Sequence, residues 1–255
     1  MALVLDGISF RYGRQAPVFI DFGLVLDAPA TVLLGPNGAG KSTLLGLAAS
    51  QLRPASGTVA LGRTRAERRA LTAYRRKVAW IPQQITPVPG LTVREQVAYA
   101  GWLKGLKRSE AWEASAAAVD RVGLSELADR KSHRVSGGQL RRIGIAGALS
   151  HRSELILMDE PTAGLDPTQR QVFRELVAEL SASVQIVVST HQTEDLADLY
   201  QQVVVLDRGT VRFQGTPQEF HALAPVPGPT SASATHGGPR ERAEAAYARL
   251  VEREV

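Results

Sequence analysis

The most informative segment of this 255-residue chain is Gly35-Pro36-Asn37-Gly38-Ala39-Gly40-Lys41-Ser42-Thr43. It satisfies the pattern G-x-x-x-x-G-K-[ST] between a short apolar run at 31–34 and a helical pattern at 41–51. Glycines allow the backbone to curl with its N–H groups facing inward, and the N-terminus of a helix attracts an anion. The segment therefore predicts a phosphate-binding loop between a buried strand and a helix, in preference to an ordinary glycine-rich turn.

The side chains that close this loop suit a nucleoside triphosphate. Lys41 supplies a compact positive charge for the β- and γ-phosphates, Ser42 offers a hydroxyl to Mg²⁺, and Thr43 is a further phosphate donor. The loop alone does not indicate which reaction the nucleotide undergoes.

Two adjacent carboxylates, Asp159 and Glu160, follow the apolar run at 155–158. In a parallel sheet the C-terminal end of such a strand lies beside the phosphate-binding loop. Asp159 is then placed to hold Mg²⁺ or its waters, and Glu160 to orient the attacking water. Mere surface polarity is the alternative, which the loop upstream disfavours.

A third motif is Val135-Ser136-Gly137-Gly138-Gln139. Ser136 and Gln139 have the spacing of a capping box at the start of a helix. Two glycines in the first turn cost roughly 1 kcal/mol each relative to alanine, so they suggest that something approaches the backbone there. The residues alone make this a second candidate anion site, and they do not decide whether an anion binds there.

The remaining pattern predicts an α/β fold with a mostly parallel sheet, because strand-like and helical segments alternate. Helices are expected over 92–130, broken at Gly101, Gly105 and Gly123. Residues 203–213 form a predicted hairpin around Asp207-Arg208-Gly209. The expected strands lie at 3–10, 22–26, 31–34, 57–61, 78–81, 155–158, 186–189 and 203–206.

The composition of the chain argues against a membrane-spanning or secreted protein. The chain is 44% hydrophobic, has no cysteine and carries a formal charge of +5. Its apolar runs are far shorter than the roughly 18 to 20 residues of a membrane-spanning helix, and its first residues lack a signal-peptide pattern, so a cytosolic location is expected. Basic residues cluster at Arg63, Arg65, Arg68, Arg69, Arg75, Arg76 and Lys77. Few aromatic residues accompany them, so a solvated face is favoured over a nucleic-acid site.

The C-terminal part changes in composition. Residues 224–239 are dominated by Pro, Ser, Ala, Thr and Gly, which predicts a flexible linker. Residues 240–255 are charged and carry an apolar stripe at helical spacing. That stripe could dock on a partner or on its own domain, and a loosely ordered tail is the alternative.

Taken together, these segments resemble the nucleotide-binding subunit of an ABC transporter, over about residues 1–222 and with the motifs in the family's order. Residues 35–43 resemble Walker A, 155–160 resemble Walker B with its catalytic glutamate, and 135–139 resemble the signature, with Val135 where Leu is usual. Gln83 resembles the Q-loop glutamine, residues 163–166 the D-loop, and His191 the switch histidine. Tyr12 lies where the family places an aromatic ring against adenine, although a core role is the alternative.

The resemblance implies a P-loop NTPase core, an N-terminal antiparallel β region and a helical subdomain inserted at about 92–133. It also implies Mg²⁺-dependent ATP hydrolysis with Lys41, Gln83, Glu160 and His191 as catalytic residues, and Ser42, Gln83 and Asp159 as metal ligands. ATP would be bound by Tyr12, Gly35, Pro36, Asn37, Gly38, Ala39, Gly40, Lys41, Ser42, Thr43, Ser136, Gly137, Gly138, Gln139 and Asp166.

The expected partners are a second nucleotide-binding subunit, in a head-to-tail homodimer or heterodimer, and separate transmembrane subunits. The transmembrane contact is expected through the helical region near 92–130 and the loop after Gln83, which would hold the protein at the inner face of the membrane. Residues 89–95 are similar to ATPases of drug-exporter and ABC-2-type systems. The expected domains are 1–222, a linker at 223–239 and a tail at 240–255.

Two other functions are weighed against transport. A soluble ABC-type ATPase acting on nucleic acid or on a protein assembly is disfavoured, because such members carry two cassettes or long coiled coils. A P-loop kinase is disfavoured by the signature motif and by His191. No nucleic-acid partner is expected.

Overall fold

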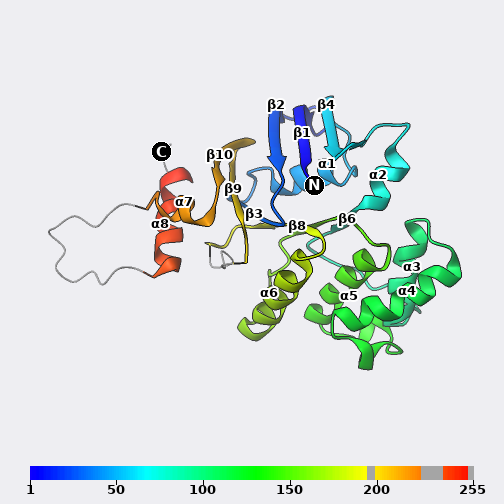
Figure 1. The fold of residues 1–255 in the computed structure, drawn as a ribbon. Coiled ribbons are helices and arrows are strands. Elements are labelled where there is room, and N and C mark those ends of the chain that lie inside the picture. Colours follow the sequence, from blue (N-terminus) through cyan, green and yellow to red (C-terminus); the bar gives the residue numbers. More distant parts are fainter. Residues whose placement is uncertain (194–198, 225–237, 252–255) are drawn as a thin grey trace.

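A computed structural model describes residues 1–193, 199–224 and 238–251. Its centre is a six-stranded sheet in the order β10-β9-β3-β8-β7-β6 (Figure 1). Neighbouring strands are parallel except for β9 and β10, which confirms the expected mostly parallel sheet. The strands are β3 (Ala30–Leu34), β6 (Val78–Ile81), β7 (Leu155–Asp159), β8 (Gln185–Thr190), β9 (Gln202–Asp207) and β10 (Thr210–Gly215).

A second, antiparallel sheet is built mainly from the N-terminal residues, in the order β2-β1-β4-β5. It confirms the antiparallel β region. Its strands are β1 (Leu3–Arg11), β2 (Pro17–Leu26), β4 (Ser56–Leu61) and β5 (Thr64–Arg65).

Helix α1 (Lys41–Ala48) belongs to the apolar core that joins the two sheets. Strand β7 is buried along its whole length, because it faces a different core on each side. Leu155 and Leu157 belong to the core that includes α1, whereas Ile156 and Met158 belong to the core that includes residues of the helices on the other face of the sheet. The phosphate-binding loop thus leads into a buried helix.

The helical subdomain contains α3 (Val93–Leu103) and α4 (Arg108–Arg121), which pack on α5 (Gly137–Ser150) (Figure 1). Short 3₁₀ turns lie at Ser125–Leu127 and Ser132–Arg134. The prediction that Gly101 breaks a helix was wrong: it lies inside α3. A Cβ there would lie 3.0 Å from Ser150 Oγ, so Gly101 permits close packing of α3 against α5. Gly105 and Gly123 follow the ends of α3 and α4 with positive φ, as expected.

Helix α6 (Pro167–Ser181) buries Phe173, Leu176, Val177 and Leu180 in the core on its face of the sheet. The predicted hairpin at 203–213 is confirmed as β9 and β10, with Arg208 and Gly209 at φ 46° and 73°. Both values fit a two-residue turn that follows the strand twist.

Two short elements follow the sheet. Helices α7 (Pro217–His221) and α8 (Pro239–Val251) pack on each other and on β9 and β10. Residues 240–251 of the predicted tail thus contact their own domain. Most of the predicted linker at 223–239, namely residues 225–237, is outside the described residues. The same holds for the last residues of the tail, 252–255. The described part of the chain contains no helix long and apolar enough to span a bilayer.

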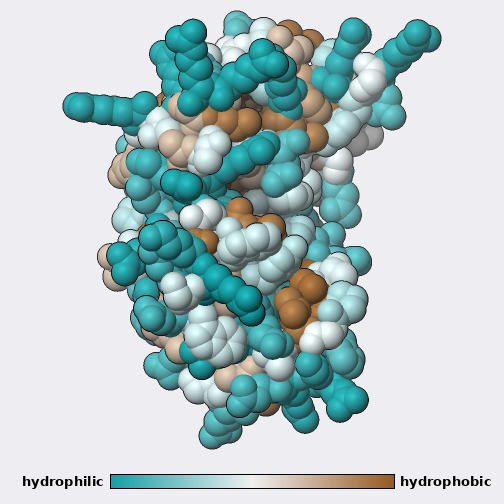
Figure 2. All heavy atoms as spheres, turned by 90° about the vertical axis from the view of Figure 1, so that its right-hand side faces the viewer, coloured by the Kyte–Doolittle hydropathy of each residue, from teal (hydrophilic) through white to brown (hydrophobic). Residues whose placement is uncertain are grey.

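The basic segment surrounds α2 (Leu71–Lys77), on the side of the molecule that also carries α3 and α4. Most of its arginines are exposed, while Lys77 pairs with Glu154 at 3.2 Å. Figure 2 shows this side as mostly hydrophilic, with long hydrophilic side chains along its upper edge. The exposed arginines fit the interpretation of the basic segment as a solvated face.

Candidate functional site

The phosphate-binding loop connects β3 to α1, and helix α1 begins at Lys41. Gly38 and Gly40 have φ values of 83° and 105°, in the left-handed region that glycine adopts without strain. The Lys41 ammonium group donates to the carbonyls of Gly35 at 2.7 Å and Pro36 at 3.1 Å. The loop therefore wraps around a positive charge that is only 6% exposed.

The β9–β10 hairpin supports this loop from outside. Gly209 N donates to Ala39 O at 3.0 Å. A Cβ on Gly35 would lie 2.2 Å from Leu206 O, so only glycine fits at the start of the loop. This support was not predicted, because the hairpin residues in these two contacts are about 170 positions away along the chain.

The two carboxylates come to the same edge of the sheet, because β3 and β7 both lie beside β8 and all three run parallel. Glu160 Oε1 lies 3.6 Å from Lys41 Nζ. Burial lowers the pKa of Lys41, and the nearby charges of Glu160 and Asp159 oppose that shift. Glu160 itself has φ 46°, an uncommon conformation for a residue with a side chain.

The end of β8 contributes two further groups. His191 Nδ1 lies 2.7 Å from Glu160 Oε2, so Lys41, Glu160 and His191 form one cluster. Ser189 is buried, and its hydroxyl contacts both Asp159 and the backbone N–H of Glu160. Ser189 was missed from the sequence, although its place two residues before His191 could have drawn attention to it.

Tyr12 lies at the edge of the same site. It is 43% exposed, and its hydroxyl is 3.1 Å from Thr43 Oγ1. Its ring packs edge-on against Phe10 with 4.9 Å between centroids. Tyr12 is therefore a partly exposed ring beside the phosphate-binding loop.

The motif at 135–139 forms a different surface. Ser136 caps α5, accepting from Gln139 N, and the Gln139 side chain accepts from Ser136 N, which confirms the capping box. Ser136 and Gly137 are exposed, and Ser136 lines a small cavity with Leu165 and Gln169, away from residues 35–43. Within one chain, then, Ser136, Gly137, Gly138 and Gln139 do not join the phosphate-binding loop.

Asp166 lies on this second side of the site, whereas Gln83 is joined through Arg141 to the turn after β7. Asp166 caps α6, accepting from Gln169 N at 2.8 Å. Gln83 is exposed, and its carbonyl accepts from Arg141 Nη2 at 2.8 Å. Arg141 also donates to carbonyls just after β7. These contacts were not predicted, because nothing in the sequence distinguishes Arg141 from its neighbour Arg142 in α5.

The comparisons with known proteins agree with this geometry. A family model described as "ABC transporter" matches residues 26–163. The linearmycin resistance ATP-binding protein LnrL of Bacillus subtilis is 36% identical over 216 residues, which cover 84% of this chain and 69% of that protein. The cobalt import ATP-binding protein CbiO of Rhodobacter capsulatus is 37% identical over 218 residues, covering 84% and 78%.

A solved structure gives the same result. It is described as a dimeric, post-hydrolysis state of the ATP-binding cassette MJ0796 bound to ADP and Pi. The two folds agree with a TM-score of 0.73 and 25% identity over 84% of this chain and 98% of that one. The fold, the motif order and these relatives together show that the chain belongs to the ABC transporter family, as an ATP-binding subunit that hydrolyses ATP to energise transport.

Proposed function

We propose that Lys41, Glu160 and His191 form the hydrolytic centre of this ATPase, with Glu160 as the general base. The observation that carries the proposal is the contact of the Glu160 carboxylate with both Lys41 and His191. A carboxylate so placed can accept a proton from water, and the two nitrogens can stabilise negative charge on the transferred phosphoryl group. The loop 35–43 holds the phosphates through its backbone N–H groups, and Tyr12 stacks on the base.

The residues present suit Mg²⁺ as well as ATP. Asp159 is only 7% exposed and has an oxygen bonded to Ser189, which fixes its orientation. Mg²⁺ is usually held by one or two carboxylates together with substrate phosphates, so a larger cluster of acidic side chains is not required. We assign Asp159, Ser42 and Gln83 to the ion. When bound, it neutralises charge on the β- and γ-phosphates.

The second half of the site comes from another cassette. Gly137 and Gly138 begin a 14-residue helix after the exposed cap Ser136, so the N–H groups of the two glycines and the Ser136 hydroxyl are available to a phosphate held by a different copy. The related cassette MJ0796 is described as dimeric, which supports this arrangement. Asp166, exposed at the start of α6, lies on the same side and would approach the partner's nucleotide.

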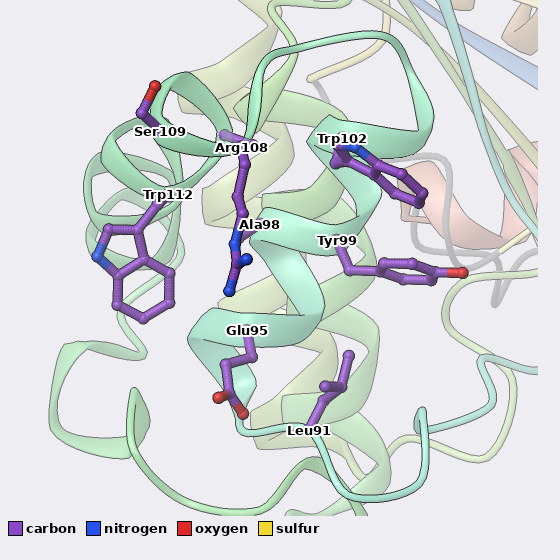
Figure 3. Close-up of a pocket in the computed structure, with 9 residues that line it drawn as sticks. Leu91, Glu95, Ala98, Tyr99, Trp102, Arg108, Ser109 and Trp112 are labelled. Atoms are coloured by element: carbon purple, nitrogen blue, oxygen red, sulfur yellow. The ribbon is translucent and has the colours of Figure 1, made fainter.

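Transmembrane subunits are the third component of the proposal, bound at the inner face of the membrane. Figure 3 shows the candidate docking surface, a cleft of 1020 Å³ on α3 and α4. Its aromatic side chains are unusually exposed: Tyr99 40%, Trp102 52% and Trp112 43%. Tyr99 stacks on Trp102, and Arg94 lies 4.0 Å above the ring of Trp112.

Exposed aromatic side chains flanked by charge are typical of a protein interface. Glu95 and Arg108 border the aromatic cleft with opposite charges, so a helical segment carrying both signs would fit it. We therefore infer that a cytoplasmic helix of a transmembrane subunit occupies this cleft. Trp102→Glu should abolish co-purification with that subunit, whereas Ile20→Glu, on the exposed face of β2, should not.

The decisive test of the hydrolytic centre is Glu160→Gln. This variant should bind ATP with near-normal affinity, hydrolyse it at least about 10²-fold more slowly and accumulate as a closed dimer. Glu154→Gln is the matched control, because Glu154 precedes the opposite end of β7 and pairs with the partly exposed Lys77. Near-normal turnover by Glu160→Gln would remove Glu160 from its role.

A further inference from the structure

We propose that Arg141 is a positioning residue for hydrolysis, which holds the turn after Glu160 and joins it to the Gln83 loop. This inference rests on the proposed role of Glu160. Arg141 lies on α5, five residues after Ser136, and its side chain reaches away from the signature toward the end of β7.

The contacts of Arg141 join three parts of the chain. Its Nη1 donates to the carbonyls of Glu160 at 3.3 Å, Pro161, and Ala163 at 3.4 Å. Its Nη2 donates to Gln83 O at 2.8 Å. One planar guanidinium group therefore connects α5, the turn that carries the proposed general base, and the first residue after the Trp80-Ile81-Pro82 strand end.

The Glu160 turn needs such support because its backbone is strained. A left-handed φ of 46° is unfavourable for a residue with a Cβ and persists only where its surroundings impose it. Glu160 N is bonded to Ser189 O and Ser189 Oγ, each at 3.1 Å. Arg141 binds the carbonyl of Glu160. The contacts at the N–H group and at the carbonyl of Glu160 together fix the direction in which its carboxylate points.

Only arginine among the basic residues has the geometry for this task. Its rigid fork places two nitrogens on separate acceptors, whereas lysine offers one compact ammonium group. All four described acceptors are backbone carbonyls, so the contacts give position and involve no proton transfer. Any displacement of the Gln83 loop is passed through the same group to Glu160.

The test is Arg141→Lys, which keeps the charge and loses the fork. We expect kcat for ATP to fall about tenfold while KM for ATP stays within about twofold, because the ATP-binding loop 35–43 does not contact Arg141. Arg142→Lys is the matched control: Arg142 is the next residue of α5 and also bonds carbonyls, those of Val122 at 3.0 Å and Gly123 at 3.4 Å. It should leave both constants near wild type.

A double-mutant cycle separates positioning from a general structural effect. If Arg141 acts through Glu160, Arg141→Lys should change the residual single-turnover rate of Glu160→Gln by less than about twofold. A further tenfold loss in that background, or equal loss in Arg142→Lys, would overturn the inference. Unfolding midpoints establish that each variant folds. If Arg141→Lys does not fold, Arg141→Gln, which keeps one donor nitrogen, replaces it in the same cycle.

The two proposals fail in different ways. Fast turnover by Glu160→Gln alone would contradict the proposed general base, whatever Arg141 does. Slow turnover by Glu160→Gln together with unchanged kcat in both Arg141 variants would contradict only the positioning role.

Discussion

Ser189 Oγ donates a hydrogen bond of 2.6 Å to Asp159 Oδ1, and both residues are almost completely buried. The serine is the residue before the last of β8 and the aspartate ends its neighbour β7, so parallel pairing places them side by side. The same serine also holds Glu160 N. One hydroxyl thus orients the proposed metal ligand and the backbone of the proposed general base.

Ser189→Ala should therefore weaken Mg²⁺ binding and raise the Mg²⁺ concentration that ATPase activity requires. Loss of a group that orients a ligand typically costs 10- to 100-fold in metal affinity, and we expect the Mg²⁺ concentration for half-maximal ATPase activity to rise about tenfold. Titration of ATPase activity with Mg²⁺ measures it. Ser181→Ala, which removes one local bond on α6, serves as control. An unchanged Mg²⁺ requirement would separate Ser189 from the metal site.

Ser136→Arg should abolish hydrolysis and spare ATP binding by the single chain. The substitution places a bulky cation at the exposed N-terminus of α5, where a second cassette is proposed to present its phosphates, and leaves residues 35–43 untouched. Equilibrium ATP binding beside an ATPase assay measures the two effects. The exposed Ser125→Arg, in the same subdomain, should retain activity. Equal loss of binding and hydrolysis in Ser136→Arg would argue against a shared site.

Gly35→Ala should destabilise the protein, because its Cβ would meet Leu206 O at 2.2 Å. We expect a loss of about 1–3 kcal/mol in the free energy of unfolding, from overpacking between the loop and β9. Denaturant unfolding measures it. Gly23→Ala is the control, since its Cβ would have nothing within 4 Å and it lies exposed in β2. Equal stability of the two variants would show that the loop is not held against β9.

His151 should make stability depend on acid pH. Burial, together with the positive charge of Lys104, lowers the pKa of His151 to about 4 from the ordinary 6.5. The unfolded chain therefore binds the proton first, so this contribution is fully present above pH 6.5 and is lost as pH falls toward about 4. His151→Gln should flatten the pH dependence of the unfolding free energy in that window. The exposed His133→Gln should not, and an identical slope in both would refute the assignment.

Several features of this fold follow from local sequence. The glycine pattern at 35–40 with Lys41 requires a phosphate-binding turn, and the capping box of Ser136 and Gln139 forms within four residues. Strands such as 155–158 are recognisable because residues buried on both faces are uniformly apolar. The helix break predicted at Gly101 was wrong, because a glycine needed for close helix packing looks the same in sequence as one that ends a helix.

The sequence by itself determined the chemistry of the chain: a phosphate loop, two acids after a buried strand and a serine-capped helix, each specified by residues adjacent to one another. Only the tertiary structure decided which distant groups control them. Ser189 reaches Asp159, Arg141 reaches Glu160 and Gln83, and Gly209 supports Ala39 because strand order and helix packing bring together residues separated by 19 to 170 positions. Such contacts depend on the whole fold, and no local pattern of residues encodes them.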